Sequence, residues 1–180
     1  MTAKEVILGR RSVRKYSDKA VEDSVLQEIV EEASYAPSWK HTQITRYIAV
    51  KDAALKERIA KEGTTIWPGN GEIIKQAPVL VAVCVVKNRS GFERDGSYST
   101  EREDRWEFFD AGIASQTFCL AAYEHGLGTV ILGLFDIDTV SSLIEVPEGQ
   151  ELVALIPVGY PAEEPVAPKR KAVSDLLTIR

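Results

Sequence analysis

The sequence predicts an α+β fold, because its 180 residues contain long helical patterns and only a few strand patterns. Two segments carry this prediction. Residues 78–86 are continuously apolar, which is typical of a central strand that is buried on both faces. Residues 101–125 have acidic side chains at the start, a largely apolar middle and Gly126 as a stop, which predicts a long central helix.

The first half of the chain predicts helices before and after a single strand. Gly9 ends a short helix, and Pro37 ends a second one that Asp23 or Ser24 caps. β-Branched and aromatic residues in alternation predict the strand. The expected order is a helix at 3–9, a helix from 23 or 24 to about 36, a strand at 45–51, a helix at 53–61 and a loop at 63–71.

The second half predicts the remaining strands and an extended C-terminal arm. The arm has little to pack on within one chain, which indicates a partner subunit. We expect one domain over residues 1–180. The expected order is the buried strand at 78–86, a mobile loop at 88–100, the helix at 101–125, a strand at 129–132, a helix at 136–144, a strand at 151–159, and the arm from about 161 with a short helix at 173–177.

Composition excludes several classes of function. A formal net charge of −5 argues against a general nucleic-acid binder, which needs a broad basic face. Cys84 and Cys119 lie in apolar runs and are expected to be core residues, and no Cys/His cluster has metal-ligand spacing, so no metal site is expected. No apolar run approaches the roughly 20 residues of a membrane span, and no signal peptide is recognisable. We expect a cytoplasmic protein without a membrane or nucleic-acid partner.

Two basic clusters stand out in this acidic chain. They are residues 10–15 (RRSVRK) and residues 169–171 (KRK). Arginine supplies planar forks for phosphate oxygens, lysine supplies point charges, and Ser12 adds a hydroxyl. Solvated surface charge is the alternative explanation. A third segment, residues 36–43 (APSWKHTQ), favours the phosphate.

Six segments in order resemble the nitroreductase family of flavin-dependent oxidoreductases. Residues 10–16 resemble its opening motif RRSxR[KR][FY], and residues 36–43 resemble its A-P-S-x-x-N-x-Q-P-W signature. His41 stands in the place of the usual Asn, and Ile44-Thr45 replace Pro-Trp, which affects the hydrogen bonding at the flavin edge and the substrate pocket. The other four are 110–116 with 121–122 and the turn at 126–129, then 133–136, 154–161 and 169–171.

The resemblance implies a three-layer α-β-α sandwich with a mostly antiparallel central sheet, in an intertwined homodimer. It also implies tightly bound FMN, with NAD(P)H as the reductant. Hydride would pass by way of flavin N5 to nitroaromatic, quinone or similar small acceptors in a ping-pong cycle. The flavin carries the hydride, so no side chain is assigned as catalytic.

Three alternatives remain open at the level of sequence. One is a flavin-fragmenting or dehalogenating member of the superfamily, and another is a flavin-binding sensor or carrier without turnover. The third is a nucleic-acid or anionic-surface binder that uses its basic ends. We interpret residues 88–100, with Phe92 and Tyr98, as a lid that selects the acceptor; an ordinary surface loop is the alternative.

The expected cofactor-binding residues fall into three groups. The phosphate and ring-edge group has Arg10, Lys169 and Lys171 on the phosphate with Arg170 as a substitute, Ser12 on a phosphate or ribityl oxygen, and Arg14 at the N1/O2 edge. Arg11 also belongs to this group, although the alternative is that Arg11 or Lys15 turns away into solvent or an ion pair. Pro37, Ser38, Trp39, Lys40 and Gln43 complete the partner's site, although Trp39 alternatively packs at the interface. Asn70 serves the pyrimidine edge, and Leu132 and Gly133 offer backbone contacts near N5. Asp110 and Gln116 are expected only to pack helices.

Overall fold

The computed structural model describes residues 1–180 and has the mixed α+β architecture that the sequence predicts. Its strands are β1 (Thr45–Val50), β2 (Val79–Val86), β3 (Gly128–Thr129) and β4 (Gln150–Gly159). Its helices are α1 (Ala3–Gly9), α2 (Asp23–Ala33), the 3₁₀ turn η1 (Trp39–His41), α3 (Ala53–Glu62), α4 (Pro68–Gln76), α5 (Arg105–Glu124), α6 (Ile137–Leu143) and α7 (Val173–Leu176).

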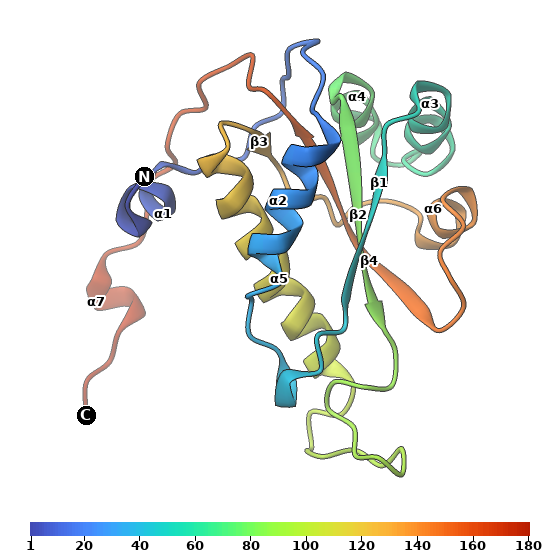
Figure 1. Ribbon diagram of the computed structural model, residues 1–180. Coiled ribbons are helices and arrows are strands. Elements are labelled where there is room, and N and C mark those ends of the chain that lie inside the picture. Colours follow the sequence, from blue (N-terminus) through green and yellow to red (C-terminus); the bar gives the residue numbers. More distant parts are fainter.

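The sheet separates two layers of helices. Its strands lie in the order β1-β2-β4-β3, and every pair is antiparallel. Helices α2 and α5 cover one face, whereas α3, α4 and α6 cover the other (Figure 1). This arrangement confirms the three-layer sandwich with an antiparallel sheet.

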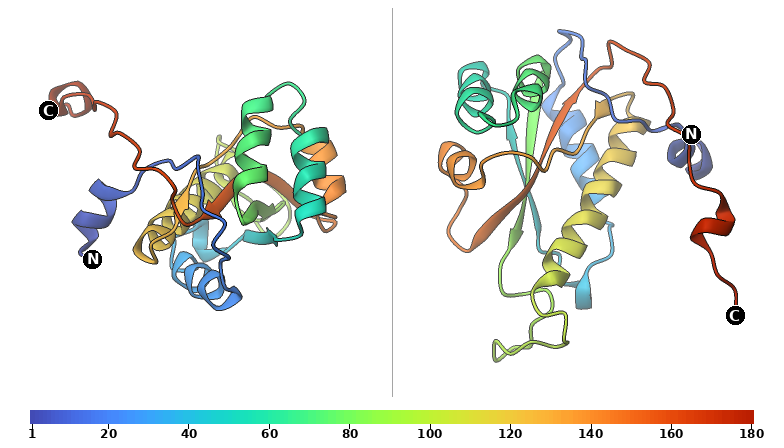
Figure 2. Two further views of the ribbon diagram at one scale, coloured as in Figure 1. Left: turned by 90° about the horizontal axis from the view of Figure 1, so that it is seen from above. Right: turned by 180° about the vertical axis from the view of Figure 1, so that it is seen from behind.

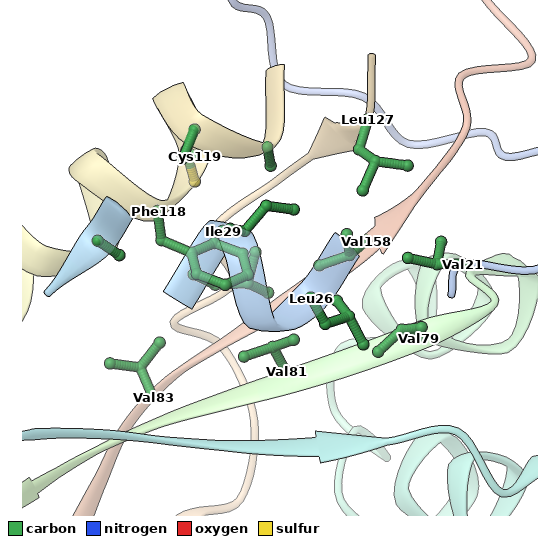
Figure 3. Close-up of a cluster of buried hydrophobic side chains, with 14 of the residues drawn as sticks. Val21, Leu26, Ile29, Val79, Val81, Val83, Phe118, Cys119, Leu127 and Val158 are labelled. Carbon is green, nitrogen blue, oxygen red and sulfur yellow. The ribbon is translucent and has the colours of Figure 1, made fainter. Parts of the chain in front are cut away.

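Strand β2 supplies side chains to both hydrophobic cores. Successive side chains of a strand point to opposite faces. Val79, Val81 and Val83 therefore pack with Phe118 and Ile29 on the α2–α5 side (Figure 3). Leu80, Ala82 and Cys84 pack with Ile59 and Ile74 on the side of α3 and α4. The continuous apolar run of the sequence thus marks a strand that is buried on both faces.

Both cysteines are core residues, as predicted. Each is free and buried, one in each of the two cores. Burial raises the pKa of the Cys84 thiol to about 11. Burial also raises the pKa of Cys119. Neither thiol is therefore poised as a nucleophile.

Helix α4 corrects the prediction of a loop at 63–71. The run Pro68-Gly69-Asn70-Gly71 has the composition of a turn, but α4 begins at Pro68. Proline suits the first turn of a helix, where its missing N–H would have no partner in any case. Ile74 is fully buried against the core, and this tertiary contact outweighs the weak helix propensity of the two glycines.

Three other boundaries differ from the prediction. Helix α2 ends at Ala33 and not near Ala36, because tight turns follow it before Pro37. Helix α5 begins at Arg105, after turns over residues 101–104. Strand β3 covers only Gly128–Thr129 and not 129–132. Beyond Thr129, Leu132 alone forms a bridge, with Leu155 of β4.

Helix α5 is buried on one side only, whereas its apolar composition predicts burial nearly all round. Phe108 is 48 % exposed and Phe109 is 58 % exposed. Gly112 and Gln116 continue the exposed face, and a Cβ at Gly112 would meet no atom within 4 Å. Of the small residues predicted to pack against another helix, Ala111, Ala114 and Ser115 are buried within the chain, and only Gly112 is left uncovered.

The C-terminal arm is extended, as predicted. After residue 161 the chain passes α1 and leads away from the sheet, and α7 lies apart from the body in every view (Figure 2). Val173 is 71 % exposed, Leu176 is 70 % exposed and Ile179 is 86 % exposed. The arm thus carries apolar side chains without a core to receive them. None of the helices combines the length and the apolar character that a membrane span requires.

We predict that Lys56→Met destabilises the protein by about 1.5–3 kcal/mol, the contribution of hydrogen bonds from a charged donor. Lys56 is buried, and its Nζ donates to the carbonyl oxygens of Ala77 (2.5 Å) and Pro78 (3.1 Å). Burial lowers the pKa of this ammonium group, yet methionine would leave both carbonyl groups without a donor. Chemical denaturation measures the free energy of unfolding. Lys61→Met, on the exposed side of the same helix, is the control, and an equal effect of the two substitutions would contradict the prediction.

Candidate functional site

The first basic cluster lies on an extended segment that two other segments hold in place. Val13 N–H donates to the Thr129 carbonyl oxygen (3.0 Å), and Ser17 N–H donates to that of Tyr160 (2.9 Å). Val13 is buried against Gly128, where any Cβ would lie 2.7 Å from the valine side chain. The absence of a side chain at position 128 therefore allows the segment to approach β3.

Alternation along this segment leaves one row of polar side chains free. Residues i and i+2 of an extended chain share a face. Val13 faces the core, so Arg10, Ser12 and Arg14 lie on the other face, half-buried or exposed. No ion pair engages these arginines, and the only side-chain hydrogen bond of the three is a long one, from Arg14 Nη1 to the Ser12 carbonyl oxygen (3.4 Å).

Arg11 points the other way and caps α1. Its Nη1 donates to the carbonyl oxygens of Leu8 (2.7 Å), Arg10 (2.8 Å) and, more weakly, Gly9 (3.3 Å). These carbonyl groups end the helix and have no partner within it. Lys15 is also engaged, since its Nζ lies 4.0 Å from Glu163. The structure therefore gives both of these cations local partners.

The second basic cluster lies on the arm, and no hydrogen bond or ion pair joins it to the first. Lys169, Arg170 and Lys171 are all exposed. Only the beginning of the arm is joined to the basic segment, because Ala162 N–H donates to the Lys15 carbonyl oxygen (2.9 Å) and the Glu163 carboxylate accepts the N–H of Arg14 (3.1 Å). A cleft of about 770 Å³ lies between the arm, Arg11 and the end of α5.

The segment that follows Thr129 continues the same edge of the sheet. Val130 and Leu132 are buried, whereas Ile131 and Gly133 are exposed. The Leu132 N–H and carbonyl groups are both hydrogen-bonded to Leu155 (2.8 and 3.0 Å). The backbone contact to the flavin that we expected from Leu132 would therefore compete with these two bonds. Gly133 has a free N–H, and a Cβ there would meet no atom within 4 Å.

Asn70 lies beside Gly133, although the two are far apart in the sequence. Its Nδ2 donates to the Leu134 carbonyl oxygen (2.9 Å), which ties the first turn of α4 to the 130–135 segment. Leu134 and Ile131 are 55 % and 45 % exposed. Free polar groups here adjoin exposed apolar side chains, which is the combination that a flat ring with a polar edge requires.

The Pro37–Gln43 segment is held in a strained backbone conformation. Lys40 (φ 43°), His41 (φ 58°) and Gln43 (φ 48°) all occupy the left-handed region. This conformation costs a non-glycine residue roughly 1–2 kcal/mol. Such strain persists only where the surroundings fix the chain, and it concentrates at functional sites. Ser38 contributes by accepting the N–H of Gln43 with its hydroxyl oxygen (2.9 Å).

Asp110 of α5 holds the Pro37–Gln43 segment from beneath. The carboxylate is 2 % exposed, and its two oxygens accept the N–H of Trp39 at 3.1 and 3.0 Å. One of them also accepts the hydroxyl of Ser90 at 2.7 Å. The Trp39 ring packs on Trp106, with centroids 4.5 Å apart. Sequence reasoning gave Asp110 only a role in helix packing; the available signal was a single acidic residue beside the small residues of an apolar helix.

The 88–100 loop contacts the same segment. Lys40 Nζ pairs with Glu93 at 2.7 Å, and Ser99 donates to the same carboxylate oxygen at 2.6 Å. Phe92 and Tyr98 pair across the loop with ring centroids 4.9 Å apart. The loop thus has internal contacts and two attachments to Pro37–Gln43, one through Lys40 and one through Asp110. A cleft of about 920 Å³ opens beside them, between α2, β1 and α5.

The candidate residues therefore form two groups at opposite ends of α5. Asp110 marks one end, and Tyr123, whose ring contacts Gly9 at the start of the basic segment, marks the other. Thirteen residues of helix separate them, or about 20 Å at 1.5 Å per residue. Figure 2 shows η1 and the 88–100 loop at one end of α5 and the N-terminal segment at the other.

Comparison with known proteins gives a consistent picture. The family model described as Nitroreductase family matches residues 7–68 and 61–160. A Methanothermobacter thermautotrophicus protein with the provisional name NADH dehydrogenase/NAD(P)H nitroreductase is 31% identical over 169 residues, covering 92% of this chain and 80% of its own. FMN reductase [NAD(P)H] of Bacillus subtilis is 31% identical over 167 residues, 87% of this chain and 65% of its own. The crystal structure of a nitroreductase family protein from Clostridium novyi NT aligns with a TM-score of 0.78 and 27% identity, over 91% of this chain and 87% of that one.

Proposed function

The chain belongs to the nitroreductase family and is an NAD(P)H-dependent oxidoreductase, and from this premise we propose that it binds FMN tightly and reduces nitroaromatic, quinone or similar small acceptors. The observation that carries the proposal is the free row of Arg10, Ser12 and Arg14 on a segment fixed to β3. A dianionic phosphate needs cationic and hydroxyl donors of this kind, and this face has them uncommitted.

The residues present fit FMN in their chemistry. We assign the phosphate to Arg10 and Ser12, with Lys169, Arg170 and Lys171 closing over it from the arm. Arg14 lies two residues further along the same face, and a cation at the N1/O2 edge favours the anionic reduced ring. Gly133 N–H and the amide of Asn70 supply polar contacts to the ring, beside the exposed side chain of Ile131.

FMN, when bound, supplies the redox chemistry, because its N5 accepts a hydride from NAD(P)H and later delivers it to the acceptor. The chain binds and orients the reactants. Its exposed apolar side chains exclude water around the ring, and the 88–100 loop borders the place where an acceptor would lie. Nicotinamide and acceptor use that place in turn, which is a ping-pong cycle.

We further propose that residues 1–180 form one FMN-binding domain that works as a homodimer. Within one chain, Pro37–Gln43 lies about 20 Å from the basic segment along α5 and cannot cover a flavin held there. A second copy can supply it. The uncovered face of α5, with Phe108, Phe109 and Gly112, and the apolar arm both need a partner to bury them.

The test of the proposed function is the visible spectrum of the purified protein. We expect flavin absorbance that NADH or NADPH bleaches without oxygen, and that an added quinone or nitroaromatic compound restores. A flavin that neither nucleotide bleaches would indicate a carrier or sensor without turnover. Release of halide from a halogenated phenol, with no turnover of quinones, would indicate a dehalogenating member.

We predict that Arg10→Ala weakens FMN binding by about ten- to a hundredfold. One charged hydrogen bond to phosphate is worth about 1.5–3 kcal/mol. Fluorescence titration of the apoprotein measures the dissociation constant. Lys51→Ala removes the same charge elsewhere, where the ammonium group pairs with Asp23 (2.7 Å), and should leave FMN affinity unchanged. Equal FMN affinities of the two variants would contradict the assignment of Arg10 to the FMN phosphate.

Mixed dimers test whether two copies share each site. One chain carries Arg10→Ala, and the other carries Trp39→Ala with Gln43→Ala, so each variant alone should bind FMN poorly. If Pro37–Gln43 acts on the partner's flavin, a mixed dimer has one site with both groups intact, and about half of the wild-type flavin content returns. The two chains carry different affinity tags for isolation. No recovery in the mixed dimer, or a monomer that holds its full flavin in light scattering, would contradict the shared site.

A further inference from the structure

Asp110 makes contacts that neither FMN binding nor simple packing explains. It is one of two buried carboxylates on α5; Glu107, 3 % exposed, is the other. Glu107 accepts the N–H of Arg89 (3.2 Å) and makes no hydrogen bond to Pro37–Gln43. Asp110 alone among the buried acids bonds to the backbone of that segment, through Trp39. The two carboxylates thus lie on the same helix and are equally buried, but Glu107 binds the backbone of Arg89 whereas Asp110 binds the backbone of Trp39.

A buried carboxylate is costly unless hydrogen bonds satisfy it. Asp110 is satisfied by Trp39 N–H and the Ser90 hydroxyl, and these are charge-assisted bonds, the stronger kind. Trp39 begins the stretch in which Lys40, His41 and Gln43 adopt left-handed backbone conformations. The carboxylate therefore fixes the chain at the point where the strain begins.

The same carboxylate joins this segment to the 88–100 loop. Ser90 is fully buried near the start of the loop, and its hydroxyl shares Asp110 Oδ2 with Trp39. At the far side of the loop, Glu93 pairs with Lys40. The hydrogen bonds of Asp110 connect the segment and the loop in the interior, and the Lys40–Glu93 ion pair connects them at the surface. Exposed ion pairs contribute little to stability, so the buried hydrogen bonds determine how the segment and the loop are placed relative to each other.

We propose that Asp110 is a positioning residue that holds the Pro37–Gln43 segment and the start of the 88–100 loop as one unit, and thereby sets how this unit lies over the flavin and admits the acceptor. This inference rests on the proposed function, because it takes the segment to cover a flavin. It adds a residue that acts through others and touches neither the cofactor nor the acceptor.

Four variants separate this role from ordinary stabilisation. Asp110→Ala removes both bonds. Asp110→Asn keeps an oxygen for Trp39 N–H and an amide that can donate to the Ser90 hydroxyl oxygen, so it should restore part of the effect. Ser90→Ala releases the loop and leaves the bond to Trp39. Glu107→Ala is the matched control, since it removes an equally buried carboxylate one turn away.

Amide hydrogen exchange gives a readout that does not depend on flavin. Asp110→Ala should speed exchange at Trp39 by roughly tenfold or more, the effect of losing a charged hydrogen bond. Exchange over residues 88–92 should also rise. Glu107→Ala should speed exchange at Arg89 and leave Trp39 unchanged.

FMN titration and acceptor kinetics give the functional readout. Asp110→Ala should weaken FMN binding by about tenfold and change the ranking of acceptors by kcat/KM. Ser90→Ala should change the ranking while FMN affinity stays at the wild-type value, and Glu107→Ala should leave FMN affinity unchanged. Asp110→Asn should lie between Asp110→Ala and the wild type in both measurements.

Two outcomes would overturn the positioning role. The first is that Asp110→Ala and Glu107→Ala change Trp39 exchange and FMN affinity equally, which would make Asp110 a general core residue. The second is that Trp39 exchange responds to Asp110→Ala while FMN affinity and acceptor ranking do not. A wild-type protein without FMN would instead refute the proposed function, and the exchange comparison would still show whether Asp110 fixes the segment.

Discussion

The burial of β2 on both faces is the constraint on which the rest of this structure depends. Every residue from Val79 to Val85 is at most 2 % exposed. A strand so placed needs partners on both edges for its N–H and carbonyl groups, and β1 and β4 supply them. It also needs a helical layer on each face. The layer that contains α5 then runs past β1 at one end and β3 at the other, so the candidate groups at the two ends of α5 follow from the sheet.

Local patterns predicted most of the elements because each depends on its own residues. The apolar run of β2 is such a signal, and the structure confirms it. The cap predicted at Asp23 or Ser24 is wrong, because α2 begins at Asp23 after Glu22 and no side chain caps it. Two predictions were wrong where tertiary contacts decide. Helix α4 forms in a glycine- and proline-bearing run because Ile74 reaches the core. Helix α5 leaves Phe108 and Phe109 exposed, since an apolar composition cannot show whether the covering surface belongs to the same chain.

The candidate site was predictable where the basic motif lies on an extended segment, in which side chains alternate between two faces. Positions 10, 12 and 14 share a face as an extended segment requires, and the same alternation turns Arg11 toward α1. The sequence does not predict the hydrogen bonds of Asp110, because Ser90 and Trp39 lie 20 and 71 residues away from it along the chain. It also does not predict that both backbone groups of Leu132 are hydrogen-bonded to Leu155. Contacts of this range depend on the packed fold and leave no local pattern.

The two departures from the family signature become intelligible in backbone terms. His41 has φ 58°, and among non-glycine residues Asn, Asp and His are those enriched in the left-handed region, so His in the place of Asn keeps the turn accessible. Ile44, where the family has Pro, is 1 % exposed and packs with Val85 and Ala111, and its carbonyl oxygen accepts the N–H of Val86 (2.9 Å). Ile44 is therefore part of the core that anchors the segment to β2. One departure is thus compatible with the left-handed backbone of the segment, and the other anchors the end of the segment in the core.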